Sequence, residues 1–175
     1  MSNIFINYLK HIGLIANIDT TKRGIEIGCS KLNTMAKIPS KAHTGKFEDA
    51  AFDLFASEDI LLQPTHREMV GTGIRFIIPD GYWIKLRERS GLANKGIHVL
   101  GGVIDSGYTG EVKVILYNSS TEPVHITRDK AICQFTVERL NLAYIEELDT
   151  ESFGIESCMR LRSDNGFGST DVKHK

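Results

Sequence analysis

The sequence has little of what marks secreted, membrane-spanning or polyanion-binding proteins. Its three cysteines, Cys29, Cys133 and Cys158, lie far apart without a Cys-x-x-Cys pair, so neither a disulfide framework nor a zinc site is predicted. It shows no export signal and no run of about 18 apolar residues, which predicts a chain that is neither secreted nor membrane-bound. The formal net charge of −1 argues against a nucleic-acid partner. We therefore expect a reducing compartment, cytoplasmic or nuclear.

Several nucleotide-binding and metal-binding patterns are also missing. Thr44-Gly45-Lys46 resembles the end of a P-loop, but Ser40 stands where a glycine is required and Phe47 stands where Ser or Thr would hold Mg²⁺. The six histidines form no H-E-x-x-H pattern and no close cluster, which disfavours a histidine-based metal centre. Strands and helices do not alternate, so a doubly wound nucleotide-binding fold is not expected.

What is present is a series of short strand candidates separated by Pro, Gly and Asp. The 175 residues, 41% of them hydrophobic, suit one domain of ordinary size. Short strands at this spacing predict an all-β sandwich, barrel or jelly roll. The candidates span residues 24–32, 51–56, 60–62, 69–78, 82–86, 99–104, 111–117, 123–126 and 131–139.

Residues 101–112, with the strand that follows, predict a tight hairpin at the centre of the function. Glycines at 101, 102, 107 and 110 permit left-handed backbone and the close approach of a ligand. A hairpin this open can offer main-chain N–H and C=O groups to a flat molecule. Asp105 ends an apolar run, where partial desolvation would make it a better proton acceptor. Taken alone, Asp105-Ser106-Gly107 is more typical of a surface turn.

Five segments in a fixed order change this interpretation. They are Ala50-Ala51-Phe52-Asp53-Leu54, Arg89-Ser90-Gly91, the hairpin around Asp105, Ala131-Ile132-Cys133-Gln134-Phe135 and Gly166-Phe167-Gly168-Ser169-Thr170. Together they resemble the ordered motifs of the homotrimeric dUTPase family, the deoxyuridine triphosphate nucleotidohydrolases, over about residues 32–171. The resemblance implies an all-β, distorted jelly-roll β-barrel at residues 23–148, between a short N-terminal extension (1–22) and a flexible C-terminal arm (149–175).

The resemblance also implies an activity, a cofactor and an assembly. A dUTPase hydrolyses dUTP to dUMP and diphosphate by attack of water on the α-phosphorus. Asp105 would contact the 3′-hydroxyl and orient that water, Mg²⁺ would bridge the phosphate oxygens, and Asp53 would contact the metal through water. Family members are homotrimers whose active sites lie at subunit interfaces, with dUTP as the partner molecule.

The resemblance assigns the substrate contacts to separate segments. Uracil would meet the main chain of Val99, Gly102 and Lys113, and Tyr108 would pack on the deoxyribose. The phosphates would meet Arg89, Ser90, Gly91 and Gln134. The arm would close over the substrate with Arg162, Phe167, Gly168 and Ser169.

Some residues depart from the family pattern or have a structural alternative. Glu88 stands where the family usually has proline, which affects the rigidity and charge of the loop beside the phosphates. The chain between Leu148 and Arg162 is longer than typical, and Arg160 is an alternative to Arg162. Asp53 could instead cap a strand end, Tyr108 could be structural and Gln134 could be simply solvated.

Two rival functions remain open. The dCTP deaminases share the fold, but their catalytic glutamate lies three residues before an asparagine, and counting back from Asn118 gives Ile115, which cannot transfer protons. A non-catalytic regulatory protein that binds dUTP is the other alternative.

Overall fold

The computed structural model describes residues 24–158; the predicted extension at 1–22 and most of the predicted arm lie outside the described residues. The chain divides into two compact units, one up to Asn141 and one from Leu142 onward. The strands of the first unit are β1 (Gly28–Lys31), β2 (Phe52–Phe55), β3 (Ile60–Leu62), β4 (Arg67–Val70), β5 (Ile74–Ile77), β6 (Tyr82–Arg87), β7 (Ile97–Leu100), β8 (Val103–Ile104), β9 (Val114–Asn118), β10 (Val124–Ile126) and β11 (Ala131–Arg139).

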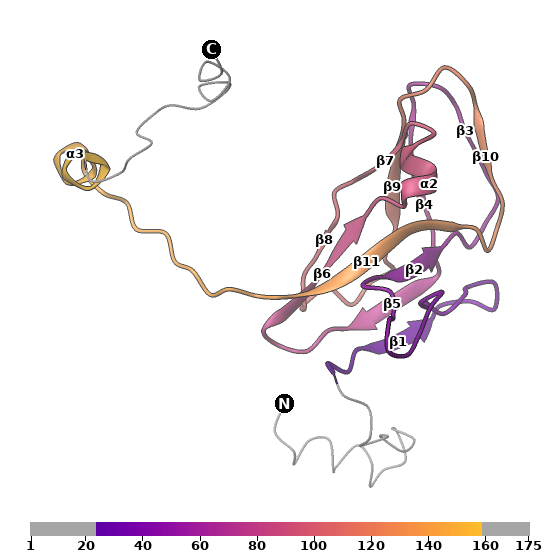
Figure 1. Cartoon of the computed structure of the whole chain (residues 1–175), viewed down its shortest axis with the longest axis horizontal. Coiled ribbons are helices and arrows are strands. Elements are labelled where there is room, and N and C mark those ends of the chain that lie inside the picture. Colours follow the sequence, from indigo (N-terminus) through magenta and orange to yellow (C-terminus); the bar gives the residue numbers. More distant parts are fainter. Residues whose placement is uncertain (1–23, 159–175) are drawn as a thin grey trace, which may run out of the picture. The chain divides into compact units, whose positions relative to one another are not determined.

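The strands pair antiparallel in four sheets (Figure 1). The largest has the order β2-β11-β6-β8, and a second has the order β4-β9-β7. Two smaller sheets pair β1 with β5 and β3 with β10. The short helix α2 (Ser90–Ala93) follows β6. The all-β prediction is confirmed.

Alternation of apolar residues along the strands builds the core. In β9, Val114, Leu116 and Asn118 are buried while Ile115 and Tyr117 are partly exposed, as the period of two requires. The amide of buried Asn118 donates to the carbonyls of Leu62 and Glu122 and accepts from Ser120, so its burial leaves no polar group unpaired. Phe52 and Phe135 stack with ring centroids 5.4 Å apart, which joins β2 to β11.

Two predicted strands are each broken by a glycine with positive φ. The predicted strand at 69–78 is β4 and β5, separated around Gly73 at φ +64°, where a Cβ atom would lie 2.7 Å from the Cβ of Ala36. The predicted strand at 99–104 is β7 and β8, separated at Gly101 with φ +63°. A left-handed residue turns the chain out of the extended path, so one apolar run becomes two strands in different sheets.

The break at Gly101 corrects the tight hairpin that the sequence predicts. β7 pairs with β9, with Leu100 opposite Ile115, but β8 pairs with β6 instead. The connection between β7 and β9 is therefore a wide loop that is fastened to a neighbouring sheet.

The sheets are jelly-roll-like but do not close into the predicted barrel. Within residues 24–158, β2 and β8 are the two edges of the largest sheet. Closure would require each edge strand to find a second partner.

The second unit contains the helix α3 (Thr150–Cys158), which the sequence analysis did not predict. Asp149 precedes it, and its carboxylate accepts the N–H of Ser152 at 2.8 Å, as a helix N-cap does. This bond lowers the pKa of Asp149. No helix within residues 24–158 is long and apolar enough to cross a membrane.

Candidate active site

Asp53 and Arg89 form a two-pronged ion pair at one end of the largest sheet. Asp53 lies on β2, and Arg89 is the second residue after β6, directly before α2. Arg89 Nε donates to Asp53 Oδ1 at 2.8 Å and Nη2 donates to Oδ2 at 3.3 Å. The side chain of Asp53 is 19% exposed and that of Arg89 is 34% exposed, so the pair is partly desolvated and still open to a ligand. This geometry fixes the plane of the guanidinium group.

Cys133 lies buried behind this ion pair. Burial raises the pKa of its thiol to about 12; the charge of Asp53 acts in the same direction and that of Arg89 opposes it. The thiol is therefore neutral near pH 7, and it cannot serve as a nucleophile.

Gln134 joins the same end of the sheet. It is opposite Asp53 on one side and opposite Arg87 on the other, so the three residues form one row across β2, β11 and β6. The amide Nε2 of Gln134 donates to the main-chain carbonyl of Glu88 at 2.8 Å. Gln134 is therefore not a glutamine whose side chain is bonded only to solvent.

Arg87 has partners of its own on the strand. Its guanidinium donates to the Thr136 hydroxyl at 3.2 Å and to the Glu138 carboxylate at 3.1 Å. The Thr136 hydroxyl also donates to Glu138, and these bonds lower the pKa of Glu138. Arg87 is thus directed along the sheet, toward Glu138.

Ser90 and Gly91 begin α2 and are both exposed. A Cβ atom built on Gly91 would meet no atom of this chain within 4 Å. The chain's own packing therefore does not require glycine there, and the space is open to a molecule outside the chain.

The hairpin residues lie on a different part of the sheet. The carbonyl of Gly102 accepts the N–H of Leu86 at 2.8 Å, and a Cβ on Gly102 would lie 2.8 Å from the carbonyl oxygen of Leu86. This glycine is therefore needed for the close contact of β6 with the hairpin. Asp105, which follows β8, is exposed, so the expected desolvation is not present in the single chain.

Tyr108 and Lys113 lie on the returning half of this loop. The Tyr108 hydroxyl donates to the carbonyl of Glu111 at 2.8 Å, and its side of the loop is exposed. The Lys113 ammonium lies 3.8 Å from the carboxylate of Glu111. Tyr108 therefore helps to hold its own loop, and the half-exposed ring remains available for contact.

Anchors at the base of this loop were missed in the sequence. The hydroxyl of buried Thr72 donates to the carbonyl of Val112 at 2.6 Å, and Glu111 Oε1 accepts the N–H of Gly73 at 2.8 Å. These bonds tie the loop to the turn between β4 and β5. Gly71-Thr72-Gly73, two glycines around a hydroxyl inside an apolar run, was the sequence signal for a turn at this place.

The register separates the two halves of the predicted site. The row of Asp53, Gln134 and Arg87 begins on β2, whereas Asp105 follows β8 at the other edge of the sheet, three strand spacings away (Figure 1). That is about 14 Å across the sheet. Ile104 is opposite Ile84, so Asp105 also lies about four residues, or about 13 Å, further along the strands than Arg87. One chain therefore does not bring Asp53 and Asp105 to the same phosphorus atom.

The residues present fit a magnesium ion that is held mainly by a substrate. No three His, Cys, Asp or Glu side chains within residues 24–158 gather as a metal site. Mg²⁺ keeps several waters and commonly binds through one or two carboxylates plus phosphate oxygens. Each oxygen of Asp53 accepts one N–H from Arg89, and a carboxylate has about four acceptor positions, so Asp53 can also accept from metal-bound water.

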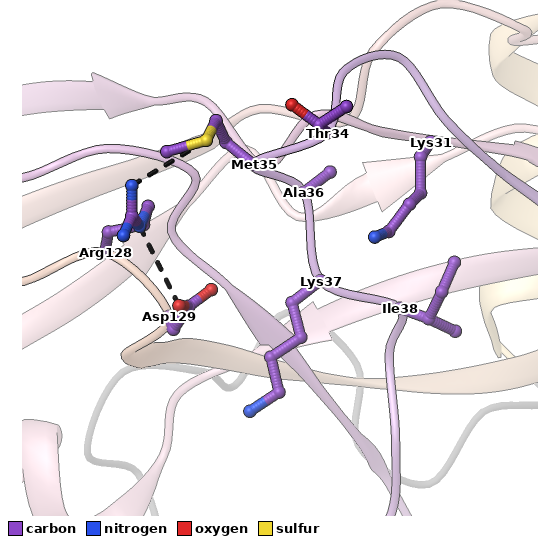
Figure 2. Close-up of a pocket in the computed structure, with 8 residues that line it drawn as sticks. All are labelled: Lys31, Thr34, Met35, Ala36, Lys37, Ile38, Arg128 and Asp129. Atoms are coloured by element: carbon purple, nitrogen blue, oxygen red, sulfur yellow. Dashed lines mark hydrogen bonds and ion pairs between the residues drawn. The ribbon is translucent and has the colours of Figure 1, made fainter.

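A surface pocket lies elsewhere in the fold, with a volume of about 460 Å³. Figure 2 shows Arg128 at its wall, 3.7 Å from the sulfur of Met35 and 3.8 Å from the carboxylate of Asp129. The Lys37 ammonium, also at the wall, lies 3.9 Å from the centroid of the Phe55 ring. None of the predicted site residues lines this pocket. The predicted arm residues Arg162, Phe167, Gly168 and Ser169 lie outside the described residues.

Comparison with known proteins identifies relatives over most of the chain. A family model for dUTPase matches residues 36–170. The deoxyuridine 5'-triphosphate nucleotidohydrolase of Helicobacter hepaticus is 40% identical over 154 residues, which cover 86% of this chain and 92% of the relative. The enzyme of the same name from Nautilia profundicola is 41% identical over 153 residues, which cover 83% of this chain and 99% of the relative.

Solved structures share the fold. A mutant dUTPase from phage phi11 of S. aureus, studied for its coordination of a structural Mg(II) ion, matches with a TM-score of 0.65 at 20% identity, over 71% of this chain and 97% of that chain. The dUTPase of Staphylococcus bacteriophage 80alpha with dUPNHPP matches with a TM-score of 0.63 at 22% identity, over 82% of this chain and 97% of that chain. The predicted dUTPase-like architecture is therefore confirmed.

Proposed function

The chain belongs to the dUTPase family, and from this premise we propose that it is a dUTP diphosphatase that hydrolyses dUTP to dUMP and diphosphate. The observation that carries the proposal is the row of Asp53, Gln134 and Arg87 with Arg89 beside it, inside the segment that the family model covers. Arg89 and Gln134 offer oriented donors to an anion at this place without a large basic surface, which suits a chain whose net charge is −1.

Arg89 and Gln134 are the proposed phosphate contacts, and both keep donors free. A guanidinium group has five N–H donors; Asp53 takes one from Nε and one from Nη2, and the Ala131 carbonyl takes one from Nη1 at 3.5 Å. One N–H on each terminal nitrogen remains. The Gln134 amide has two N–H donors, and Glu88 accepts one of them. Ser90, with open space at Gly91, completes this phosphate side.

The loop after β7 is the proposed reader of the base and sugar. Main-chain groups around Val99, Gly102 and Lys113 would pair with the edge of uracil, because a base with a different edge would leave buried partners unpaired. Tyr108, 47% exposed, would pack against the deoxyribose and exclude a 2′-hydroxyl. The bond from its hydroxyl to Glu111 holds the ring in place for this role.

Asp105 is the proposed acceptor of the water proton. The water oxygen forms the new bond to the α-phosphorus, and the water proton passes to the carboxylate of Asp105. The bond from the α-phosphorus to the oxygen that bridges the α- and β-phosphates breaks, so diphosphate leaves. When bound to the phosphate oxygens, Mg²⁺ would neutralise part of the charge that develops on them. Asp53 would hold Arg89 in orientation and accept a hydrogen bond from a metal-bound water.

The separation of Asp53 from Asp105 supports an active site shared between chains. If the hairpin of one copy faces the row on another copy, the two halves meet at the interface, as in the homotrimer that the sequence analysis expects. The outer face of the β4-β9-β7 sheet offers an apolar row for contact between copies. Leu100 and Met69, both opposite Ile115, are 42% and 57% exposed in the single chain.

The C-terminal arm is the proposed cover of the site. Phe167 would stack on uracil, and Arg162, Gly168 and Ser169 would contact the distal phosphates. An arginine fork and a hydroxyl group suit phosphate oxygens.

The test is hydrolysis of dUTP with Mg²⁺ in ¹⁸O-labelled water. We expect dUMP and diphosphate, with the label in dUMP, because the water attacks the α-phosphorus. Label in the diphosphate would contradict attack at this atom. Deamination of dCTP, measured in parallel, would instead support the deaminase alternative. Binding of dUTP without turnover would support the regulatory one.

A further inference from the structure

Glu88 connects the phosphate side of the site to the strand that leads into the hairpin. It lies between β6 and α2, directly before Arg89. Its side-chain oxygen Oε1 accepts the main-chain N–H of Val99 on β7 at 3.4 Å, a long hydrogen bond. Its main-chain carbonyl accepts the amide of Gln134 on β11 at 2.8 Å. One residue thus contacts two strands that belong to different sheets.

The contact with Val99 satisfies a group that the sheet leaves open. In the sheet of order β4-β9-β7, β7 is an edge strand with one strand neighbour, β9. Every second N–H of an edge strand points away from its neighbour and needs another acceptor. A side-chain oxygen of Glu88 is such an acceptor.

The contact with Gln134 fixes the direction of the remaining amide donor. Because one N–H of Nε2 is bonded to Glu88, the amide plane is set and the second N–H has a defined direction. The position of loop 88–91 therefore decides where both Gln134 and Arg89 present their donors.

We propose that Glu88 is a positioning residue: its carboxylate, bonded to Val99, anchors loop 88–91 to β7 and thereby places Gln134 and Arg89 for the substrate phosphates. This proposal rests on the proposed dUTP hydrolysis. Glu88 stands where the family pattern usually has proline. The hydrogen bond of its side chain restrains the loop here, where the proline ring would restrain it in other members.

Two variants separate this role from a simple effect of charge. Glu88→Ala removes the acceptor, whereas Glu88→Gln keeps an oxygen acceptor and removes the charge. We expect Glu88→Ala to raise KM for dUTP about three- to ten-fold with kcat within about two-fold, because the lost bond loosens phosphate binding in ground and transition states alike. Glu88→Gln should stay within about two-fold of the wild type for both constants. Glu122→Ala, in the loop before β10, is the matched control.

Hydrogen exchange gives a readout that does not depend on turnover. The peptide containing Val99 should exchange faster in Glu88→Ala than in the wild type and in Glu88→Gln. Equal KM values in the wild type and Glu88→Ala would overturn the proposal. A lower KM in both variants would also overturn it, because the main effect of the carboxylate of Glu88 would then be to repel the substrate phosphates. If the wild type did not hydrolyse dUTP, the proposed function would fail, while the exchange data would still report on the anchor.

Discussion

Substitution of Arg89 by lysine should separate the shape of the guanidinium group from its charge. Lysine keeps the positive charge, but it presents its donors from a single nitrogen. It cannot reproduce the two bonds to Asp53, at 2.8 and 3.3 Å, and also direct two further donors at a triphosphate. The variant therefore loses at least one charge-assisted hydrogen bond to the substrate.

The size of the loss follows from this count. A hydrogen bond to a charged group contributes about 1.5 to 3 kcal/mol, which corresponds to a loss of about 10- to 150-fold in kcat/KM. The effect on stability should be smaller, about 1 kcal/mol or less, because Arg89 is 34% exposed and solvent screens its pairing with Asp53.

The assay is diphosphate release from dUTP, together with calorimetric binding of a non-hydrolysable dUTP analogue and a thermal melt. Arg128→Lys is the matched control, because Arg128 lines the pocket of Figure 2 and none of the predicted site residues lies at that pocket. A kcat/KM within about three-fold of the wild type for Arg89→Lys would refute the proposal that the shape of the guanidinium group is needed for phosphate binding.

Four further outcomes are expected. Asp105→Asn should lower kcat by about 10² to 10⁴ while keeping affinity for the analogue, because it removes a proton acceptor and little volume; full turnover would exclude Asp105 as the base. Truncation after Arg160 should abolish most turnover while leaving the melting temperature of the β-fold unchanged, and unchanged turnover would exclude a role for the arm. The buried thiol of Cys133, with a pKa of about 12, should resist a thiol reagent at pH 8 in the native protein and react after unfolding. Because the unfolded thiol loses its proton near the reference pKa of 9.0 and the folded one near 12, this residue should make stability fall as pH rises across that range, and a denaturation series over pH would check the sign against Cys133→Ala.

The strands could be predicted from the sequence because their signal is local. Alternation in β9 and β11 needs only the apolar residues of those strands to be read in order. The breaks at Gly73 and Gly101 were harder, because a glycine inside an apolar run fits an extended strand as well as a left-handed turn. Strand partners were not accessible at all. Whether Val103 and Ile104 pair with β6 or with β9 depends on contacts between distant parts of the chain.

The sequence names candidate site residues one by one, but it does not show how they contact one another. The resemblance named Asp53 and Arg89 for different roles, and only the fold shows that 2.8 Å separates their nearest atoms. It likewise placed Asp105 and Asp53 in one site at a subunit interface, and only the register shows that within one chain β2, which carries Asp53, and β8, which precedes Asp105, are opposite edges of one sheet. The departure at Glu88 was visible in the sequence, but its bonds to Val99 and Gln134 were not.

The assembly can be measured by light scattering on a size-exclusion column. A homotrimer would have three times the mass of one 19.5-kDa chain. A monomer that turns over dUTP would contradict the shared site, because the separation within one chain leaves Asp105 far from Arg89.

The most direct test of the shared site is complementation between two inactive variants. Arg89→Ala removes the phosphate contact and Asp105→Asn removes the proton acceptor, and each variant alone should be nearly inactive. If each site combines the hairpin of one copy with the phosphate side of another, random assembly of an equal mixture, unfolded and refolded together, should restore about one quarter of the wild-type activity. A mixture that stays as inactive as its components would show that both residues must come from the same chain, and would contradict the account.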